Sequence, residues 1–211
     1  EFRRVLFRSG RVIARPYIGT KEGHFTRTSN RHDYALAPFS KTALDSLKDA
    51  GLDVIGVGKI PDIFVDQGIT RKIKTVSNED GMNKTIELAS DNFNGLAFIN
   101  LVDFDAVYGH RRNAAGYGKA IEEFDVQLGE LINELKNDDL LIVTADHGND
   151  PTYRGTDHTR EQVPLIIYSK QFNEMKVLND GDSFGIIGST ICDNFNVKYN
   201  GIGSSILKLL K

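Results

Sequence analysis

What this sequence lacks excludes several classes of protein. Cys192 is the single cysteine in 211 residues, so the chain cannot form an internal disulfide and has no cysteine-rich metal site. No apolar run approaches the roughly 20 residues that span a bilayer. The N-terminal stretch also lacks the apolar core and cleavage site of a signal peptide. We therefore expect a cytoplasmic protein, in a reducing compartment, with no membrane partner.

The sequence also lacks a long basic stretch. Its 26 Lys and Arg residues are balanced by 29 Asp and Glu residues, which leaves a formal net charge of −3. A nucleic-acid partner is not expected, because binding a polyanion requires a concentrated basic surface. A small phosphorylated substrate needs only a few local cations, so this composition permits one. With 40% hydrophobic residues, the chain can bury an ordinary globular core.

The first nine residues differ from the rest of the chain. They read EFRRVLFRS, and we interpret residues 1–9 as a translated sequencing adapter or cloning artefact that takes no part in the fold. From Gly10 the sequence GRVIARPYIG already has the character of a structured segment. We expect the chain to be cut from a longer protein.

Helical and strand patterns alternate along most of the chain. Residues 10–39 contain short strand-like runs broken by Gly, Pro and polar clusters. Beyond them, the apolar spacing predicts helices over 41–50, 78–89, 115–135, 184–195 and 204–210, and strands over 53–57, 95–102, 140–144 and 163–168. The nearly continuous apolar run 95–102 is typical of a strand buried on both faces. The pattern predicts an α/β sandwich with a mostly parallel sheet and helices on both faces.

Acidic residues and histidines follow two of the predicted strands. Ligands bind beyond the carboxyl ends of the strands in open α/β sheets. The candidate residues are Asp103, Asp105 and His110 after one strand, Asp146, His147 and Asp150 after another, and Asp157 and His158 shortly before the next. One Asp-His pair in a loop is more often a cap or a turn. Three such pairs favour a metal site of carboxylate and imidazole ligands, suited to Zn, Mn or Fe.

Several motifs carry a resemblance to a known family. TADHGN (144–149) resembles the metal-binding signature of the alkaline-phosphatase superfamily, which phosphoglycerate mutases share. LVDFDAVYGHRRNAAGYGKAIEEFD (101–125) resembles the phosphopentomutase family more specifically, as do RVIARPYIG, FTRTSNRHDYAL, GVGKIPDIF and GTDHTREQVPLI. The resemblance extends over roughly residues 10–211. It implies an alkaline-phosphatase-like core over 40–211 and the C-terminal end of an inserted cap domain over 10–39.

The resemblance implies two metal ions and a set of ligands. By motif, Asp146 and His147 would bind the first metal, and Asp105, His110 and His158 the second. The family spacing favours Asp105 over Asp103, and the resemblance implies manganese, although Mg, Zn or Co suit the same ligands. Asp150 and Asp157 are better explained as turn formers or as partners of the ligands.

Cationic residues are implied as substrate contacts. Lys59, which follows a short predicted strand, would meet the substrate or its phosphate. The cap segment would contribute guanidinium groups suited to phosphate, and its candidates are Arg11, Arg15, Arg27 and Arg31, with His32 beside them.

The implied activity is interconversion of ribose 1-phosphate and ribose 5-phosphate, with the deoxyribose analogues also accepted. In the family a phosphothreonine carries the phosphoryl group, and a sugar bisphosphate such as glucose 1,6-bisphosphate primes it. No threonine here matches that nucleophile's motif, so we expect it outside this chain. Two alternatives stay open: another enzyme of the superfamily, such as a phosphoglycerate mutase or phosphohydrolase, and a non-catalytic metal- or phosphate-binding module.

Overall fold

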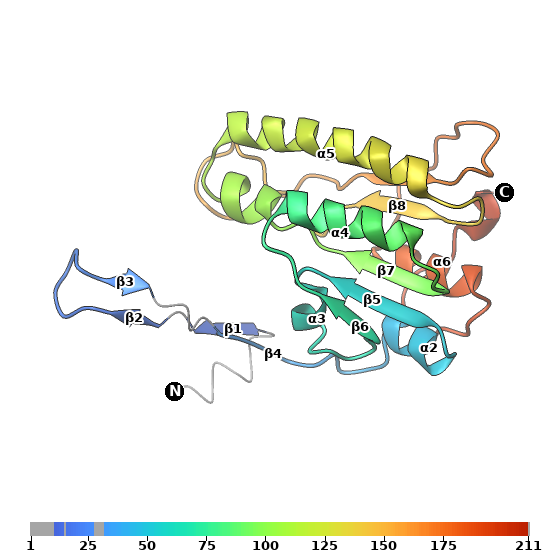
Figure 1. Cartoon of the computed structure of the whole chain (residues 1–211), viewed down its shortest axis with the longest axis horizontal. Helices are drawn as coiled ribbons and strands as arrows, with labels where there is room; N and C mark the ends of the chain where they lie inside the picture. Colours follow the sequence, from blue (N-terminus) through green and yellow to red (C-terminus); the bar gives the residue numbers. More distant parts are fainter. Residues whose placement is uncertain (1–10, 15, 28–31, 211) are drawn as a thin grey trace.

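A three-stranded parallel sheet lies at the centre of the fold, in the order β6–β5–β7 (Figure 1). The structure is a computed structural model that describes residues 11–14, 16–27 and 32–210. The interpretation of residues 1–9 as an artefact therefore lies outside the described residues, as do Arg15 and Arg31.

The remaining elements follow the predicted alternation. In chain order, the described elements are β1 (Arg11–Ala14), β2 (Tyr17–Ile18), β3 (Thr26–Arg27), β4 (His32–Ala35), α2 (Ala43–Asp49), β5 (Asp53–Val57), α3 (Ile60–Ile63), β6 (Arg71–Ile73), α4 (Asn78–Ser90), β7 (Gly95–Ile99), the π-helix η1 (Phe104–Gly109), α5 (Ala114–Glu134), β8 (Leu141–Thr144), β9 (Leu165–Tyr168), α6 (Gly185–Asn194) and the 3₁₀ turn η2 (Leu207–Leu209).

Helices cover both faces of the central strand β5. Alternate side chains of a strand point to opposite faces, and those of β5 enter two different clusters. Val54 packs with Leu47 of α2 and Cys192 of α6 on one face. Ile55 and its neighbour Val57 pack with Leu88 of α4 on the other face. The α/β fold with helices on both faces is thus confirmed.

Local capping explains where two of the helices begin. Thr42 and Asp45 form a reciprocal capping box at the start of α2. Gly51, which follows this helix, has φ +80°, a conformation that suits glycine. The side chain of Ser77 accepts a hydrogen bond from the backbone N–H of Asp80 and starts α4, as predicted.

The strands β8 and β9 run antiparallel, with Leu141 opposite Tyr168 and Thr144 opposite Leu165. The sequence predicted both strands but placed them in a mostly parallel sheet. A return in parallel orientation needs a crossover, usually a helix. Residues 145–164, which connect the two strands, contain no helix, so β9 runs back alongside β8. The parallel part of the described sheet structure is therefore β6–β5–β7.

The predicted strand over 95–102 is shorter and less buried than expected. It ends at Ile99, and the chain then enters η1. In β7 the side chain of Phe98 is 38% exposed and lies beside the ring of Phe64, with ring centroids 6.2 Å apart. No residue of β7 is fully buried, so burial on both faces was a wrong prediction for this strand, which is an edge of the three-stranded sheet. The predicted helix 204–210 is likewise reduced to the single turn η2.

The N-terminal strands form two small antiparallel pairs, β1 with β4 and β2 with β3. The β2–β3 hairpin extends away from the central sheet (Figure 1). The strand-like character predicted for residues 10–39 is confirmed in their described part, whereas their assignment to a cap domain stays a prediction.

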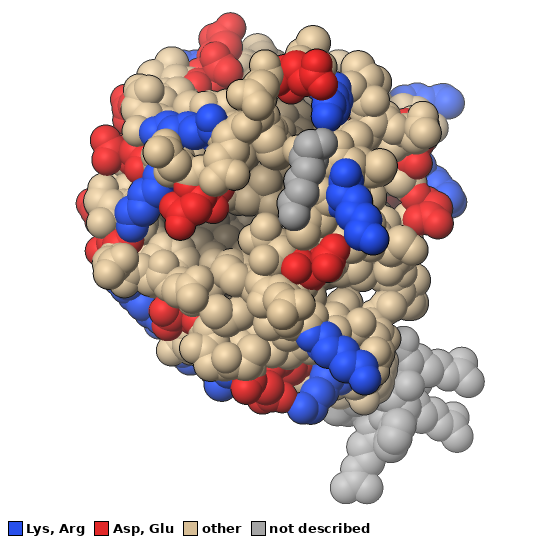
Figure 2. Space-filling model, turned by 90° about the vertical axis from the view of Figure 1, so that its right-hand side faces the viewer, with Lys and Arg blue, Asp and Glu red and all other residues tan. Residues whose placement is uncertain are grey.

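Acidic and basic side chains are interspersed over the face of the molecule shown in Figure 2. This distribution agrees with the small net charge of the sequence. Among the described residues, no helix is both long and apolar enough to cross a membrane.

Candidate metal centre

The π-helix η1 brings Asp105 and His110 together. The backbone N–H of His110 donates to the carbonyl of Asp105 across 2.9 Å, so five residues make one wide turn. In an α-helix, residues five apart would point about 140° away from each other. In the wide turn they share one side, and His110 Nε2 lies 3.4 Å from Asp105 Oδ1. Such π-turns are frequent at functional sites.

The antiparallel pair β8–β9 brings His147 and His158 together. His147 follows β8 and His158 precedes β9, and these two ends of antiparallel strands lie side by side. A bridge between Gly148 and Thr159 continues the pairing beyond the strands. As a result the two imidazole rings stack, with centroids 3.7 Å apart and planes 18° from parallel.

These two pairs meet in one cluster. His158 Nε2 lies 3.3 Å from Asp105 Oδ1, and the rings of His158 and His110 are 4.9 Å apart. Asp105, His147 and His158 each present one potential ligand atom, and these atoms lie within 4.8 Å of one another. Side chains from three distant segments of sequence therefore converge on one point beyond β7 and β8.

Hydrogen bonds to neighbouring groups orient this cluster. His110 Nδ1 is 2.5 Å from the carbonyl oxygen of Thr156. Because a carbonyl only accepts, Nδ1 donates this hydrogen bond, which leaves Nε2, on the Asp105 side, as the nitrogen that could bind a metal. Metal-bound histidines commonly have this arrangement, in which the second ring nitrogen donates to a carbonyl. The amide of Asn149 donates to Asp105 Oδ1 across 2.6 Å.

Two glycines permit this close packing. A Cβ at Gly109 would lie 2.6 Å from the amide nitrogen of Asn149. A Cβ at Gly148 would lie 2.0 Å from a carboxylate oxygen of Glu161. A larger residue at Gly109 would displace Asn149, the partner of Asp105, and one at Gly148 would displace Glu161.

Asp146 stands at the rim of the cluster. Its Oδ2 is 3.5 Å from His147 Nε2, and its side chain is 74% exposed. The sequence grouped Asp146 with His147 at a first metal and the other three ligands at a second. The structure brings His147 against His158, which is compatible with two ions about 3.5–4 Å apart. The division of the ligands between two metals stays a prediction.

The competing carboxylates are engaged elsewhere. Asp103 Oδ2 accepts a hydrogen bond of 2.8 Å from the backbone N–H of Asn78, at the start of α4. Asp150 accepts hydrogen bonds of 2.7 Å from both the hydroxyl and the N–H of Thr152, and these bonds lower the pKa of Asp150. The backbone of Asp157, in the same loop, lies next to His158. This arrangement agrees with the choice of Asp105 over Asp103 and with a turn-forming role for Asp150.

Lys59 lies at the same edge of the central sheet as the cluster. It directly follows Gly58 after β5, and β5 runs parallel to β7, so the residues after both strands emerge at one edge. The structure places Arg11 in β1 and Arg27 in β3, opposite Tyr17. The side chains of all four predicted arginines lie outside the described part of the structure, so their role as substrate contacts, like that of Lys59, stays a prediction.

Sequence reasoning assigned no role to three residues that lie around the cluster. Asn149, only 8% exposed, belongs to the TADHGN motif, and that motif was the available signal. Glu161 accepts a 2.6 Å hydrogen bond from the hydroxyl of Thr159. Burial, together with the nearby carboxylates of Asp105 and Glu161, raises the pKa of Tyr117. Tyr117 belongs to the motif 101–125, which was the available signal, but the motif gave this tyrosine no role of its own.

The residues fit a divalent metal ion. Carboxylate oxygen and imidazole nitrogen are the ligands of borderline divalent ions such as Zn and Mn, and no thiolate is present among the described cluster residues. The carboxylate of Asp105 also has a hydrogen-bonded partner in Asn149, as metal-bound carboxylates commonly do.

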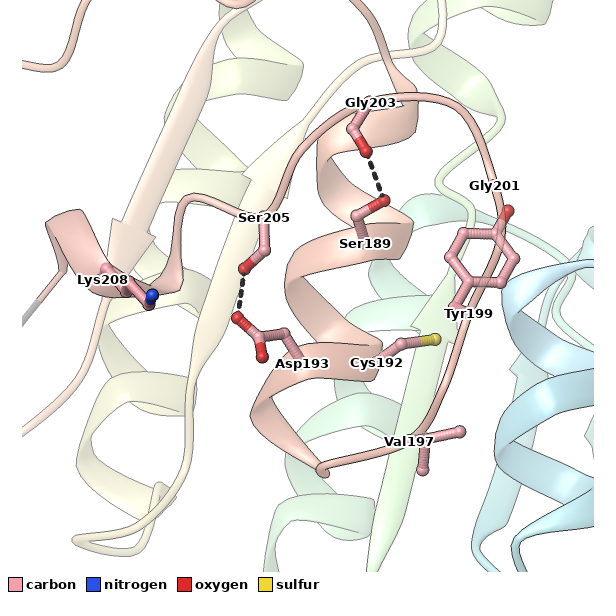
Figure 3. Close-up of a pocket in the computed structure, with 9 residues that line it drawn as sticks. All are labelled: Ser189, Cys192, Asp193, Val197, Tyr199, Gly201, Gly203, Ser205 and Lys208. Atoms are coloured by element: carbon pink, nitrogen blue, oxygen red, sulfur yellow. Dashed lines mark hydrogen bonds between the residues drawn. The ribbon is translucent and has the colours of Figure 1, made fainter.

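A separate hollow of about 430 Å³ lies between α6 and the C-terminal segment (Figure 3). Two hydrogen bonds join polar groups of its lining: Ser205 donates to Asp193 across 2.6 Å, and Ser189 donates to the carbonyl of Gly203 across 2.9 Å. Burial raises the pKa of the Cys192 thiol, which disfavours the reactive thiolate. The hollow therefore offers no chemistry comparable with that of the Asp-His cluster.

Comparison with known proteins agrees with this geometry. Residues 15–199 match the family described as the metalloenzyme superfamily. The chain belongs to the metalloenzyme superfamily. Membership implies that it binds divalent metal, and among the described residues the Asp-His cluster is chemically suited to do so.

Two curated relatives of this metalloenzyme carry the same name. The chain is 59% identical over 206 residues to the phosphopentomutase of Agathobacter rectalis, a match that covers 97% of the chain and 52% of the relative. It is 59% identical over 203 residues to the phosphopentomutase of Clostridium botulinum, covering 95% of the chain and 51% of the relative. The chain thus spans about half the length of the curated relatives it matches.

Proposed function

We propose that the protein carrying this chain is a phosphopentomutase, which interconverts the 1-phosphate and 5-phosphate of ribose or deoxyribose. The observation that carries the proposal is the 59% identity to a phosphopentomutase over 97% of the chain. The convergence of Asp105, His147 and His158 supports it, because that cluster can hold a divalent ion.

The proposed cofactor is a pair of Mn²⁺ ions. Asp146 and His147 would hold one ion, and Asp105, His110 and His158 the other. Such ions neutralise charge on a transferring phosphoryl group and lower the pKa of an attacking hydroxyl. The chain's own contribution is to fix the ligands: the carbonyl of Thr156 sets the tautomer of His110, and Asn149 fixes one oxygen of Asp105.

The proposed substrate is a pentose phosphate, held by cations. Lys59 would contact its phosphate from the edge of the central sheet, as a compact point charge. Residues 10–39 would be the end of a cap domain over the core of 40–211, and its Arg11, Arg15, Arg27 and Arg31 would meet the phosphate as guanidinium groups.

The proposed reaction passes through a phosphothreonine enzyme, primed by a sugar bisphosphate such as glucose 1,6-bisphosphate. We assign that threonine to no residue of this chain. The proposed compartment is the cytoplasm, in keeping with a single, buried cysteine.

The decisive experiment is a substrate comparison with the full-length protein. Purified enzyme with Mn²⁺ and glucose 1,6-bisphosphate is offered ribose 1-phosphate, 3-phosphoglycerate and a simple phosphate monoester in parallel. We expect ribose 5-phosphate from the first and negligible product from the others. Preferential turnover of 3-phosphoglycerate, or net release of inorganic phosphate, would instead identify a phosphoglycerate mutase or a phosphohydrolase. Metal binding without any turnover would favour a non-catalytic module.

A further inference from the structure

Arg112 makes an unusual number of side-chain hydrogen bonds just beyond η1. Its Nε donates to the carbonyl of Gly155 across 2.5 Å, and its two terminal nitrogens donate to the carbonyls of Asp150 and Asp157, each across 2.6 Å. One terminal nitrogen also donates to the side-chain oxygen of Asn149 across 2.8 Å. All four acceptors belong to the segment 149–157, which is 37–45 residues away in sequence.

One branch of this network reaches a candidate ligand through Asn149. A guanidinium group only donates, so the amide oxygen of Asn149 faces Arg112 and its N–H groups face the other way. There the amide donates to Asp105 Oδ1. This is the same carboxylate oxygen that faces His110 at 3.4 Å and His158 at 3.3 Å. Arg112 therefore fixes the orientation of the group that holds Asp105.

The other branch fixes the approach to His158. Three consecutive carbonyls precede this histidine, and all three are held: Gly155 and Asp157 by Arg112, and Thr156 by His110. The loop that delivers His158 is thus fastened to the turn that carries Asp105 and His110.

The backbone of Arg112 has a left-handed conformation, which residues other than glycine rarely adopt. Its φ is +53°, in the left-handed region, where glycine is easily accommodated and arginine is not. Such strain persists when the surrounding structure fixes it, and it concentrates at functional sites. Here the strained position is occupied by the residue with the four hydrogen bonds described above.

We propose that Arg112 is a positioning residue of the metal centre: its guanidinium sets the distance between Asp105 and His110 on one side and His158 on the other. The proposal rests on the proposed function, since it concerns the affinity of the same site for its metal. It predicts that Arg112 acts on metal affinity without touching the metal or the substrate.

The test is a calorimetric titration of the metal-free, full-length protein with Mn²⁺. Arg112→Gln removes the charge and three of the donors. Arg112→Lys keeps the charge but replaces the planar fork by a single ammonium group. Arg112→Gly relieves the backbone strain while deleting every side-chain bond. Arg71→Gln is the matched control, because Arg71 also makes a side-chain hydrogen bond, to Asp91, but lies on β6.

We expect all three Arg112 variants to bind Mn²⁺ roughly 10- to 100-fold more weakly than the wild type, the usual effect of losing a partner of a metal ligand. Arg71→Gln should bind like the wild type. If Arg112 had only a structural role, replacing it would lower the urea midpoint of the metal-free protein and leave the Mn²⁺ affinity of the folded protein unchanged. If Arg112→Gln does not fold, the lysine and glycine variants decide.

Wild-type affinity in Arg112→Lys or Arg112→Gly would overturn the positioning role, while the wild-type titration itself would still support the metal centre. Absence of Mn²⁺ binding by the wild-type protein would overturn both the metal centre and this inference.

Discussion

The imidazole rings of His147 and His158 stack face to face, with centroids 3.7 Å apart. The two histidines are eleven positions apart in the sequence, so their contact depends on the fold. The stack exists because β8 and β9 run antiparallel, so the residue that leaves one strand meets the residue that enters the other. The carboxylate of Asp105, carried by η1, presents an oxygen within 4.8 Å of a ring nitrogen of each histidine.

Loss of any cluster ligand should reduce metal binding. We expect His147→Ala, His158→Ala and Asp105→Ala in the full-length protein to lower Mn²⁺ affinity by at least about 10- to 100-fold and to abolish mutase turnover. The matched control is His24→Ala, because His24 is exposed and lies near the β2–β3 hairpin. Metal analysis and activity of each variant check the prediction. Near-normal activity with a full complement of metal would remove that residue from the ligand set.

Lys59→Ala should weaken substrate use and leave the metal content unchanged. Loss of a charged hydrogen bond to a phosphate costs about 1.5–3 kcal/mol, or about ten- to a hundredfold in kcat/KM. Lys119→Ala is the control, since that lysine is exposed on α5 and makes only a long surface ion pair with Glu123. Steady-state kinetics with ribose 1-phosphate check it. Kinetics equal to those of the control would show that Lys59 does not bind substrate.

The two methionines offer a matched pair for core stability. Met82 on α4 is 3% exposed, whereas Met175 is 93% exposed. Met82→Ala leaves a cavity beside α4 and should lower the free energy of unfolding by about 2–5 kcal/mol. Met175→Ala should change it by less than about 0.5 kcal/mol. Urea unfolding of the metal-free protein measures both, and equal midpoints would contradict the packing described for α4.

Asp80 should stabilise the fold only while it is ionised. Hydrogen bonds from Lys84, first, and from the backbone N–H of Val76 hold the pKa of this carboxyl below its ordinary value of 3.8. A lowered folded-state pKa means that the contribution is present above the unfolded pKa and is lost as the pH falls through the folded pKa. The difference in urea midpoint between wild type and Asp80→Ala should therefore stay constant above about pH 5 and shrink as the pH falls below it. Asp125→Ala, on the exposed side of α5, is the control variant. A difference that stays constant with pH would contradict this role of Asp80.

Much of the fold could be predicted because its signals are local. Three elements lie within a residue or two of their predicted bounds: the strand Asp53–Val57, the helix that begins after Ser77 and the long helix Ala114–Glu134. Each is specified by its own apolar period and capping residues. The orientation of β9 could not be predicted in this way, because it depends on the path of residues 145–164 and not on the strand's own sequence.

In the candidate site, too, the sequence indicated some residues and not others. Asp105, His110, His147 and His158 could be named from motifs, because acids and histidines after apolar strands are visible in the sequence. Asn149 and Arg112 lie within the quoted motifs, but the sequence gave them no role, because their importance lies in partners that are 37–45 residues away. The wide turn of η1 was also hidden: a spacing of five residues suggests opposite sides of an ordinary helix.

The most direct test of the metal centre is the crystal structure of the full-length protein grown with Mn²⁺, with anomalous diffraction recorded for manganese. The account predicts anomalous peaks at bonding distance from Asp105 and from the imidazoles of His110, His147 and His158. It also predicts that Asp103 stays bound to the start of α4, away from any peak. Manganese bound elsewhere, with these four side chains free of metal, would contradict it.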